Sequence, residues 1–156
     1  SMTTIHPGMV FGPLLSDDAD GASAELLSKM INGKFPALPD AYFTVVDVRD
    51  VAKLHVESLR KNQSDNKRII ATSPQGINIM EISNILRKNG YKKAPQNFIP
   101  TKVINSLAPF NKEMKSMAAM VNRGSYGADI TETISIYNWE PISLEKTLID
   151  MGNSIK

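Results

Sequence analysis

Hydrophobic and polar positions follow two different periods on either side of Asp47, and this change predicts a strand that leads directly into a helix. Residues 43–46 form a short aromatic and β-branched run, which is typical of a buried strand. From residue 48 to residue 59 the apolar positions recur about every 3.6 residues, the period of an amphipathic helix. Asp47 is placed to cap this helix, and Asp50 lies in its first turn, where the helix dipole favours a negative charge. The predicted inward stripe is Val51, Ala52, His55, Val56 and Leu59, and the predicted outward positions are Arg49, Lys53, Glu57 and Arg60.

The same reading divides the rest of the chain into short strands and helices. Strands are predicted at residues 3–6, ended by Pro7, and at residues 68–72. Capping patterns predict further helix starts at Asn78, Asp129 and Ser143. Apolar spacing adds helices at residues 22–32 and 102–107, and Met114, Met117 and Met120 recur at helical spacing. Residues 16–20 form a polar loop. We read the methionines as core or lid packing rather than as the lining of a pocket.

Composition places the chain among globular proteins and excludes several kinds of site. It has 156 residues, 42% of them hydrophobic, and no cysteine, so disulfides and thiolate chemistry are excluded. No apolar run approaches the ~20 residues of a membrane span, and we expect a cytoplasmic, single-domain protein covering residues 1–156, with Ser1 as a tag remnant. The net charge of +2 is spread along the chain, which argues against nucleic-acid binding.

The titratable residues do not form a recognisable catalytic or metal-binding pattern. Asp47 and Asp50 are read as helix-start carboxylates, and His55 as a packing residue. His6 is read as a hydrogen-bonding residue at a strand end. Two histidines 49 positions apart, without cysteine, give no zinc-like spacing.

Three segments together resemble the extended short-chain dehydrogenases/reductases. Residues 43–55 read Phe-x-x-Val-Asp-Val-Arg-Asp-Val-Ala-x-x-His, residues 7–13 read Pro-Gly-Met-Val-Phe-Gly-Pro, and residues 129–141 end in Tyr-Asn-Trp-Glu-Pro. More narrowly, they are similar to the dihydroflavonol reductase, cinnamoyl-CoA reductase and aldehyde or methylglyoxal reductase group, within the NAD-dependent epimerase/dehydratase superfamily. The resemblance implies an α/β fold: the C-terminal portion of a Rossmann-type fold, with a few-stranded sheet and about five helices.

The matched segments correspond only to the C-terminal, substrate-binding part of such an enzyme. The sequence contains neither a G-x-G-x-x-G nor a G-x-x-G-x-x-G turn, which a dinucleotide pyrophosphate requires. None of the four tyrosines is followed four positions later by lysine, so the family's Tyr-x-x-x-Lys pair is absent. We therefore expect no catalytic residue in this chain, no reductase activity when it is alone, and a nucleotide-binding half that lies upstream.

By resemblance, the chain contributes contacts to the cofactor and the substrate of the complete enzyme. The implied cofactor is NADP or NAD, bound in the full-length parent and not tightly by this chain. The implied cofactor-binding residues are Pro7, Gly8, Met9, Val10 and Ser23. The implied residues on the side of a small carbonyl substrate are Leu14, Leu15, Phe35 and Tyr42.

Two other functions remain open. The chain could be a fragment of a nucleotide-sugar epimerase or dehydratase, which shares the Asp-Val-Arg-Asp-Val-Ala segment. It could also be a stand-alone, non-catalytic binding module. In the resembling fold the strand at residues 3–6 pairs with residues 68–72 on one side and with the missing half on the other. The unpaired edge left without that half leads us to expect a homo-oligomer.

Overall fold

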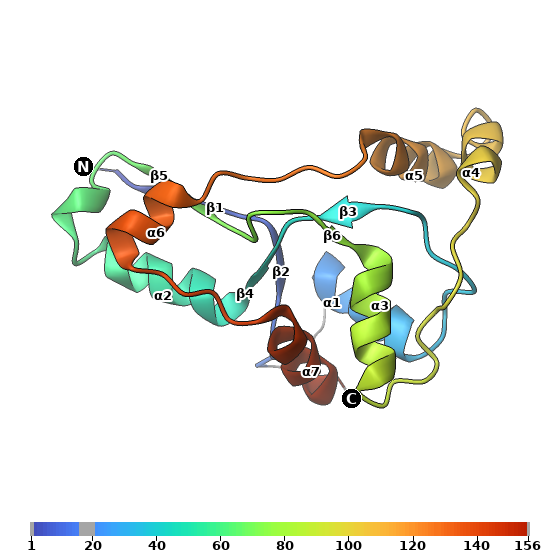
Figure 1. Ribbon diagram of the computed structural model, residues 1–156, viewed down its shortest axis with the longest axis horizontal. Helices are drawn as coiled ribbons and strands as arrows, with labels where there is room; N and C mark the ends of the chain where they lie inside the picture. The colour runs from blue at the N-terminus through green and yellow to red at the C-terminus, as the bar shows by residue number, and fades with distance from the viewer. Residues whose placement is uncertain (1, 16–20, 156) are drawn as a thin grey trace.

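The computed structural model describes residues 2–15 and 21–155, which form a mixed α/β arrangement (Figure 1). The sequence predictions for Ser1 and for residues 16–20 lie outside the described residues. In chain order the elements are β1 (Thr4–Pro7), β2 (Met9–Phe11), α1 (Ala22–Ile31), β3 (Tyr42–Phe43), β4 (Val45–Asp47), α2 (Val48–Ser58), η1 (Asn62–Ser64), β5 (Arg68–Ala71), β6 (Ile77–Asn78), α3 (Ile79–Lys88), α4 (Thr101–Leu107), α5 (Lys112–Arg123), α6 (Thr131–Tyr137) and α7 (Leu144–Ser154). The predicted α/β class is confirmed, with seven α-helices in the described residues where about five were expected.

The strands form three two-stranded units. β1 pairs in parallel with β5, and β2 pairs in parallel with β4, while β3 and β6 form an antiparallel pair. The β1–β5 pairing matches the strands predicted at residues 3–6 and 68–72. Among the described residues, β1 has no strand on its other side.

The strand predicted at residues 43–46 is in fact two strands, β3 and β4, and that prediction is corrected. The break falls at Thr44, whose carbonyl oxygen accepts from the Met9 N–H at 2.7 Å. Before this residue the chain pairs with β6, and after it the chain pairs with β2. The run is divided because its pairing changes from β6 to β2 at this point, and hydrophobic periodicity cannot predict a change of partner strand.

Asp47 caps α2 as predicted, because its Oδ1 accepts from the Arg49 N–H at 2.8 Å. The predicted inward stripe of α2 is wrong apart from Val51, which is half-buried and packs against a hydrophobic cluster. Leu54 and Asp50 are the buried residues of this helix, whereas His55, Val56 and Leu59 are exposed. The rotation is set by tertiary contacts, since Asp50 Oδ2 accepts from the Ile142 N–H at 2.8 Å and must face the protein.

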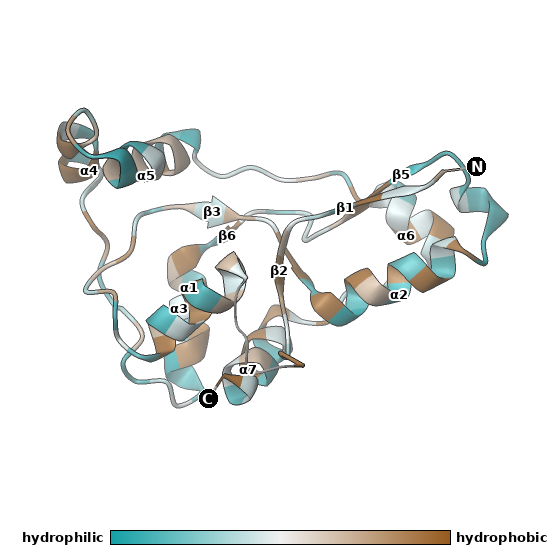
Figure 2. Ribbon diagram, turned by 180° about the vertical axis from the view of Figure 1, so that it is seen from behind, coloured by the Kyte–Doolittle hydropathy of each residue, from teal (hydrophilic) through white to brown (hydrophobic). Residues whose placement is uncertain are grey.

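Two hydrophobic clusters support the molecule. The larger one packs α1, α3 and α7 around Phe11, Leu27, Leu86 and Leu148, all nearly inaccessible. The smaller one fills the space between the β1–β5 pair, α2 and the segment around α6, with Leu54, Ile69 and Trp139 at its centre. Figure 2 shows brown apolar residues along these elements. None of the described helices is long and apolar enough to cross a membrane.

Candidate functional site

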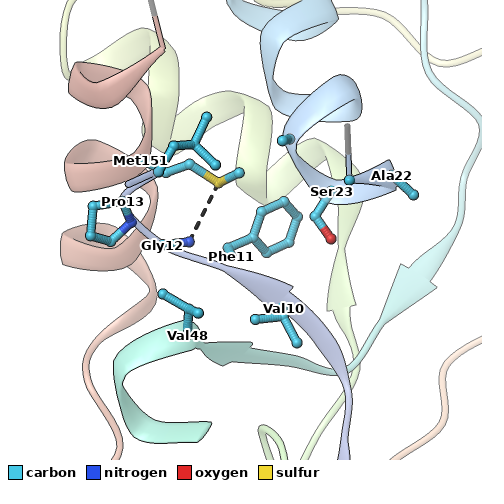
Figure 3. Close-up of a pocket in the computed structure, with 11 residues that line it drawn as sticks. Val10, Phe11, Gly12, Pro13, Ala22, Ser23, Val48 and Met151 are labelled. Carbon is cyan, nitrogen blue, oxygen red and sulfur yellow. Dashed lines mark hydrogen bonds between the residues drawn. The ribbon is translucent and has the colours of Figure 1, made fainter. Parts of the chain in front are cut away.

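A hollow of about 270 Å³ lies where the end of β2 meets the N-terminus of α1 (Figure 3). The chain enters it along β2 and returns through α1, so residues about ten positions apart face the same space. The lining consists mainly of small and apolar residues: Val10, Phe11, Gly12, Pro13, Leu14, Gly21, Ala22, Ser23, Ala24, Val48 and Met151. Such a site between a strand end and a helix start is suited to a flat apolar group with a polar edge.

Gly12 determines the shape of one wall of the hollow. Its φ of 138° is unfavourable for other residues, and an added Cβ would lie 2.6 Å from Val48 Cγ1. Its N–H donates to the sulfur of Met151 at 3.4 Å, the contact drawn in Figure 3. The Leu14 N–H donates to Ser154 Oγ at 2.9 Å. Helix α7 therefore holds the segment after β2 in place.

The opposite wall is the first turn of α1. Gly21 occupies the N-cap position and offers no side-chain hydrogen bond to the helix. The first N–H groups of a helix carry a partial positive charge and attract anions or polar ligand edges. Ser23 is half-buried in this turn, with its hydroxyl beside the hollow (Figure 3).

The predicted cofactor-binding residues are divided among this hollow, the sheet and a larger neighbouring pocket, which Met9 lines. Val10 and Ser23 both line the hollow. Pro7 and Gly8 lie at the junction of β1 and β2, where the Gly8 N–H donates to Ala71 O at 3.1 Å. Glycine is needed at position 8 because the chain there lies close to Thr72 and to the backbone of Thr44. An added Cβ would clash with Thr72 Oγ1 and lie 2.5 Å from Thr44 O.

A second and larger pocket, of about 600 Å³, lies on the other side of the α1 N-terminus. It is bounded by α1, the loop before β3 and helix α5. The lining is mostly apolar: Met9, Ala22, Leu26, Lys29, Phe35, Pro36, Ala37, Leu38, Pro39, Phe43, Ile79, Ile99, Glu113, Ser116, Met117 and Met120. Ala22 lines both cavities, so the two adjoin at one residue of α1.

The four predicted substrate-side residues are not brought together. Phe35 lines the larger pocket and Leu14 lines the smaller hollow. Tyr42 lines neither: it pairs with Asn78 between β3 and β6, and it is half-buried. Leu15 is fully exposed.

Sequence reasoning missed the contribution of α5 to the larger pocket. Met117 and Met120 were read as packing residues, and both line this pocket. Their spacing of three residues indicated that they share a helix face, which is correct. Periodicity alone did not show which element that face approaches.

Beside the smaller hollow, Asp47 is the centre of a charged cluster that holds three elements together. Its side chain is fully buried and accepts from Arg49 at 2.7 Å and from Thr147 Oγ1 at 2.7 Å. Arg49 also pairs with Asp150 on α7 at 2.7 Å. The prediction that Arg49 faces away from the protein is therefore wrong, because two carboxylates hold it across the α2–α7 contact.

The protonation of this cluster follows from its hydrogen bonds. Burial disfavours the charged form of Asp47 and is the largest single effect on its pKa. The hydrogen bonds from Arg49 and Thr147 together outweigh burial, so the pKa lies below its ordinary value. Hydrogen bonds from Arg49 and Lys146 likewise lower the pKa of Asp150. Both groups are carboxylates at neutral pH, with a structural role.

The two histidines stand apart from both cavities. His6 is exposed and its Nε2 lies 3.0 Å from Thr4 Oγ1, a local hydrogen bond at the end of β1. His55 Nδ1 lies 2.8 Å from the carbonyl oxygen of Val51 on its own helix. In residues 2–15 and 21–155, no three His, Asp or Glu side chains gather as a metal site.

Comparison with known proteins relates the chain to oxidoreductases. No protein-family model matches. An uncharacterized oxidoreductase of Saccharomyces cerevisiae is 28% identical over 99% of this chain and 42% of its own length. A Candida albicans protein named as an NADPH-dependent methylglyoxal reductase is 32% identical over 57% of this chain and 27% of its own length. A cinnamoyl-CoA reductase of Medicago truncatula is 32% identical over 56% of this chain and 26% of its own length.

Solved structures show the same partial coverage. The yeast methylglyoxal/isovaleraldehyde reductase, crystallised with NADPH, superposes with a TM-score of 0.68 at 19% identity, over 97% of this chain and 45% of the other. A nucleoside-diphosphate-sugar epimerase from Pseudomonas aeruginosa superposes with a TM-score of 0.74 at 15% identity, over 96% of this chain and 46% of the other. The chain thus spans less than half the length of these proteins. The resemblance found in the sequence is confirmed: the chain has the fold of the C-terminal part of an extended short-chain dehydrogenase/reductase.

Proposed function

We propose that this chain is the substrate-binding part of an NADPH-dependent carbonyl reductase and is inactive alone. One observation carries the proposal: the hollow beside the α1 N-terminus and the larger apolar pocket adjoin at Ala22. A hydride acceptor must lie next to the cofactor ring, and two adjoining cavities allow that arrangement. The names of the relatives support NADPH over NADH.

In this proposal the smaller hollow receives the nicotinamide end of the cofactor, which supplies the hydride when bound. The backbone of Val10 and the Ser23 hydroxyl orient the carboxamide. Met9 contributes apolar surface on the side of the larger pocket, because its N–H is already donated to Thr44. Pro7 and Gly8 position the strand against the sheet. Leu14 and Phe35 contribute apolar surface from the two cavities. The proton donor and the pyrophosphate-binding turn come from elsewhere, since this chain contains neither Tyr-x-x-x-Lys nor the glycine-rich turn.

The free side of β1 is the proposed attachment point for a nucleotide-binding half. Ile5 is half-buried on this strand, whose ladder with β5 occupies one side only. When that half is lacking, we propose that a second copy pairs along the same edge, because an unpaired strand edge readily joins another chain. Light scattering of the purified chain should then show a dimer that Ile5→Lys weakens and Gln63→Lys, on the exposed η1, does not.

Activity measurements test the central proposal. The chain alone should oxidise no NADPH with an apolar ketone above a heat-inactivated control. Co-expression with the segment of the Saccharomyces cerevisiae relative that lies before the matched region should restore turnover. Turnover by the chain alone would refute the proposal, and a stable but inactive complex would favour the non-catalytic binding module.

The epimerase alternative rests on the fold match to the Pseudomonas aeruginosa protein. A sugar nucleotide carries two phosphates and several hydroxyl groups, which need basic and polar partners. The larger pocket is lined mainly by apolar side chains, and its one cation, Lys29, is paired with Glu25 at 2.6 Å. These features favour the reductase.

A cytoplasmic location stays a prediction from the sequence.

A further inference from the structure

Helices α4 and α5 form a hairpin that covers the larger pocket while packing little against the rest of the protein. Figure 1 shows it at one end of the molecule, joined to the body by two extended segments. Ile104 is the buried residue of α4 and Ala118 that of α5. The two helices contact each other, and Asn105 and Asn122 exchange hydrogen bonds of 3.3 to 3.4 Å between them.

Each extended segment forms one isolated β-bridge with the body. Phe98 pairs with Leu38 in the segment before α4, and Gly127 pairs with Gln75 in the segment after α5. Backbone hydrogen bonds of 2.7 to 2.9 Å from and to Leu38 support the first bridge. The hairpin is therefore anchored at its base, and among the described residues a space of about 600 Å³ lies beneath α5.

Four residues of α5 line the pocket, and two of them, Met117 and Met120, carry thioether side chains. Met117 and Met120 lie opposite Leu26, Phe35 and Phe43 of the body across a space of about 600 Å³. Methionine is unbranched and polarisable, so it adapts to apolar ligands of different shape. An apolar pocket with few polar groups takes ligands that bury mostly carbon surface.

The charges around the pocket disfavour anions. Lys29 is paired at 2.6 Å with Glu25, which lies one helical turn away, and both side chains are partly exposed to solvent. Glu113 lies on the α5 side of the pocket and carries a negative charge. An anionic ligand would lose its hydration and meet a carboxylate, without gaining an unpaired cation among the described lining residues.

We propose that this pocket binds a bulky, uncharged, apolar ligand, and that Met117 and Met120 on the hairpin select it by packing directly against it. The identity of this ligand as the carbonyl substrate rests on the function proposed above, whereas the binding site itself does not. Substrates with a free carboxylate or a phosphorylated carrier are excluded by the same account.

Two small molecules with one ring system test the charge selection. Acetonaphthone and naphthoate share the naphthalene ring and a carbonyl group, but only naphthoate is charged. When each compound is titrated into the chain in a calorimeter, naphthoate should bind at least about tenfold more weakly than acetonaphthone, as expected for an anion placed in an apolar site. Equal affinities, or no binding of acetonaphthone at millimolar concentration, would overturn the proposal.

A matched pair of variants tests the role of the hairpin. Met120 and Val103 are 45% and 44% exposed on its two helices, but only Met120 lines the pocket. Met120→Glu should weaken acetonaphthone binding by at least about tenfold, and Val103→Glu by less than about twofold. Equal weakening by both would show that the hairpin responds to added charge as a whole, and would overturn the assignment.

Methyl NMR provides a measurement that needs no substitution. Acetonaphthone should shift the methionine methyl signals of Met9, Met117 and Met120, and leave that of Met80, which lies outside the pocket lining, unchanged. The opposite pattern would place the ligand elsewhere and refute the site. If these signals shift as expected but the co-expressed complex has no reductase activity, the binding site stands and the proposed function fails.

Discussion

Replacing Asp47 should destabilise the protein more than the loss of a helix cap does. In Asp47→Ala the N–H of Arg49 loses its acceptor, and a lost cap costs about 1 kcal/mol. The buried hydroxyl of Thr147 loses its partner as well, and an unpaired buried polar group costs about 1–3 kcal/mol.

The lost ion pair adds little to this cost. The Arg49 side chain is 37% exposed and keeps Asp150 at 2.7 Å, so solvent and the remaining carboxylate compensate for most of the pairing. We therefore expect Asp47→Ala to lower the free energy of unfolding by about 3 kcal/mol.

Urea unfolding, followed by the fluorescence of the buried Trp139, measures this loss. Asp129→Ala is the matched control, because the exposed Asp129 also accepts a hydrogen bond at a helix start, from the Thr131 N–H at 2.9 Å, although Ile130 is the N-cap residue of α6. This control should lose about 1 kcal/mol or less. Equal losses in the two variants would refute the reasoning. A large loss of activity in a reconstituted enzyme, without a loss of stability, would instead identify Asp47 as a catalytic carboxylate.

Two further predictions use the same unfolding measurement. The native pKa of Asp47 and Asp150 lies below the ordinary aspartate value of 3.8, so their stabilisation is complete above that pH and is lost as the pH falls through the native values. Asp47→Asn should accordingly flatten the acid side of the stability profile, and an unchanged profile would contradict this. Gly8→Ala should strongly lower the free energy of unfolding, because the added Cβ would clash with the Thr44 backbone. Gly21→Ala should change it by less than about 1 kcal/mol, because an added Cβ there meets no described atom within 4 Å. Similar effects at both glycines would be inconsistent with the packing described.

The sequence predicted the parts of the fold that depend on local chemistry. The predicted caps at Asp47, Asn78 and Ser143 are confirmed, because a side chain and a backbone N–H two or three residues later determine each one. The cap predicted at Asp129 is wrong by one position, since Ile130 is the N-cap residue of α6 and Asp129 accepts from the Thr131 N–H from outside the helix. The rotation of α2 was not predicted. The spacing of apolar residues allows either Leu54 or His55 to face inward. Which of them does so depends on the hydrogen bond that Asp50 accepts from the N–H of Ile142, 92 positions away in the chain.

The candidate site was predicted only in part for the same reason. Val10 and Ser23 are close in sequence and share one hollow. Phe35 and Met117 share the other pocket although 82 positions separate them in the chain, and no local pattern relates them. Leu15 and Leu14 are neighbours of the same type, yet only Leu14 lines a cavity, because its N–H is fixed by Ser154.

The hydrogen bonds between α7 and the segment after β2 have a consequence for biosynthesis. The N–H groups of Gly12 and Leu14 can form their hydrogen bonds only after Met151 and Ser154 have been synthesised, 139 and 140 residues later in the chain. The ribosome synthesises Met151 and Ser154 long after Gly12 and Leu14, so the apolar end of β2 stays unassembled while the intervening residues are made. Contacts of such long sequence separation form slowly, and the exposed strand can meet other chains first. Supply of chaperone during synthesis, rather than the final stability of the protein, should therefore limit its yield in the cell.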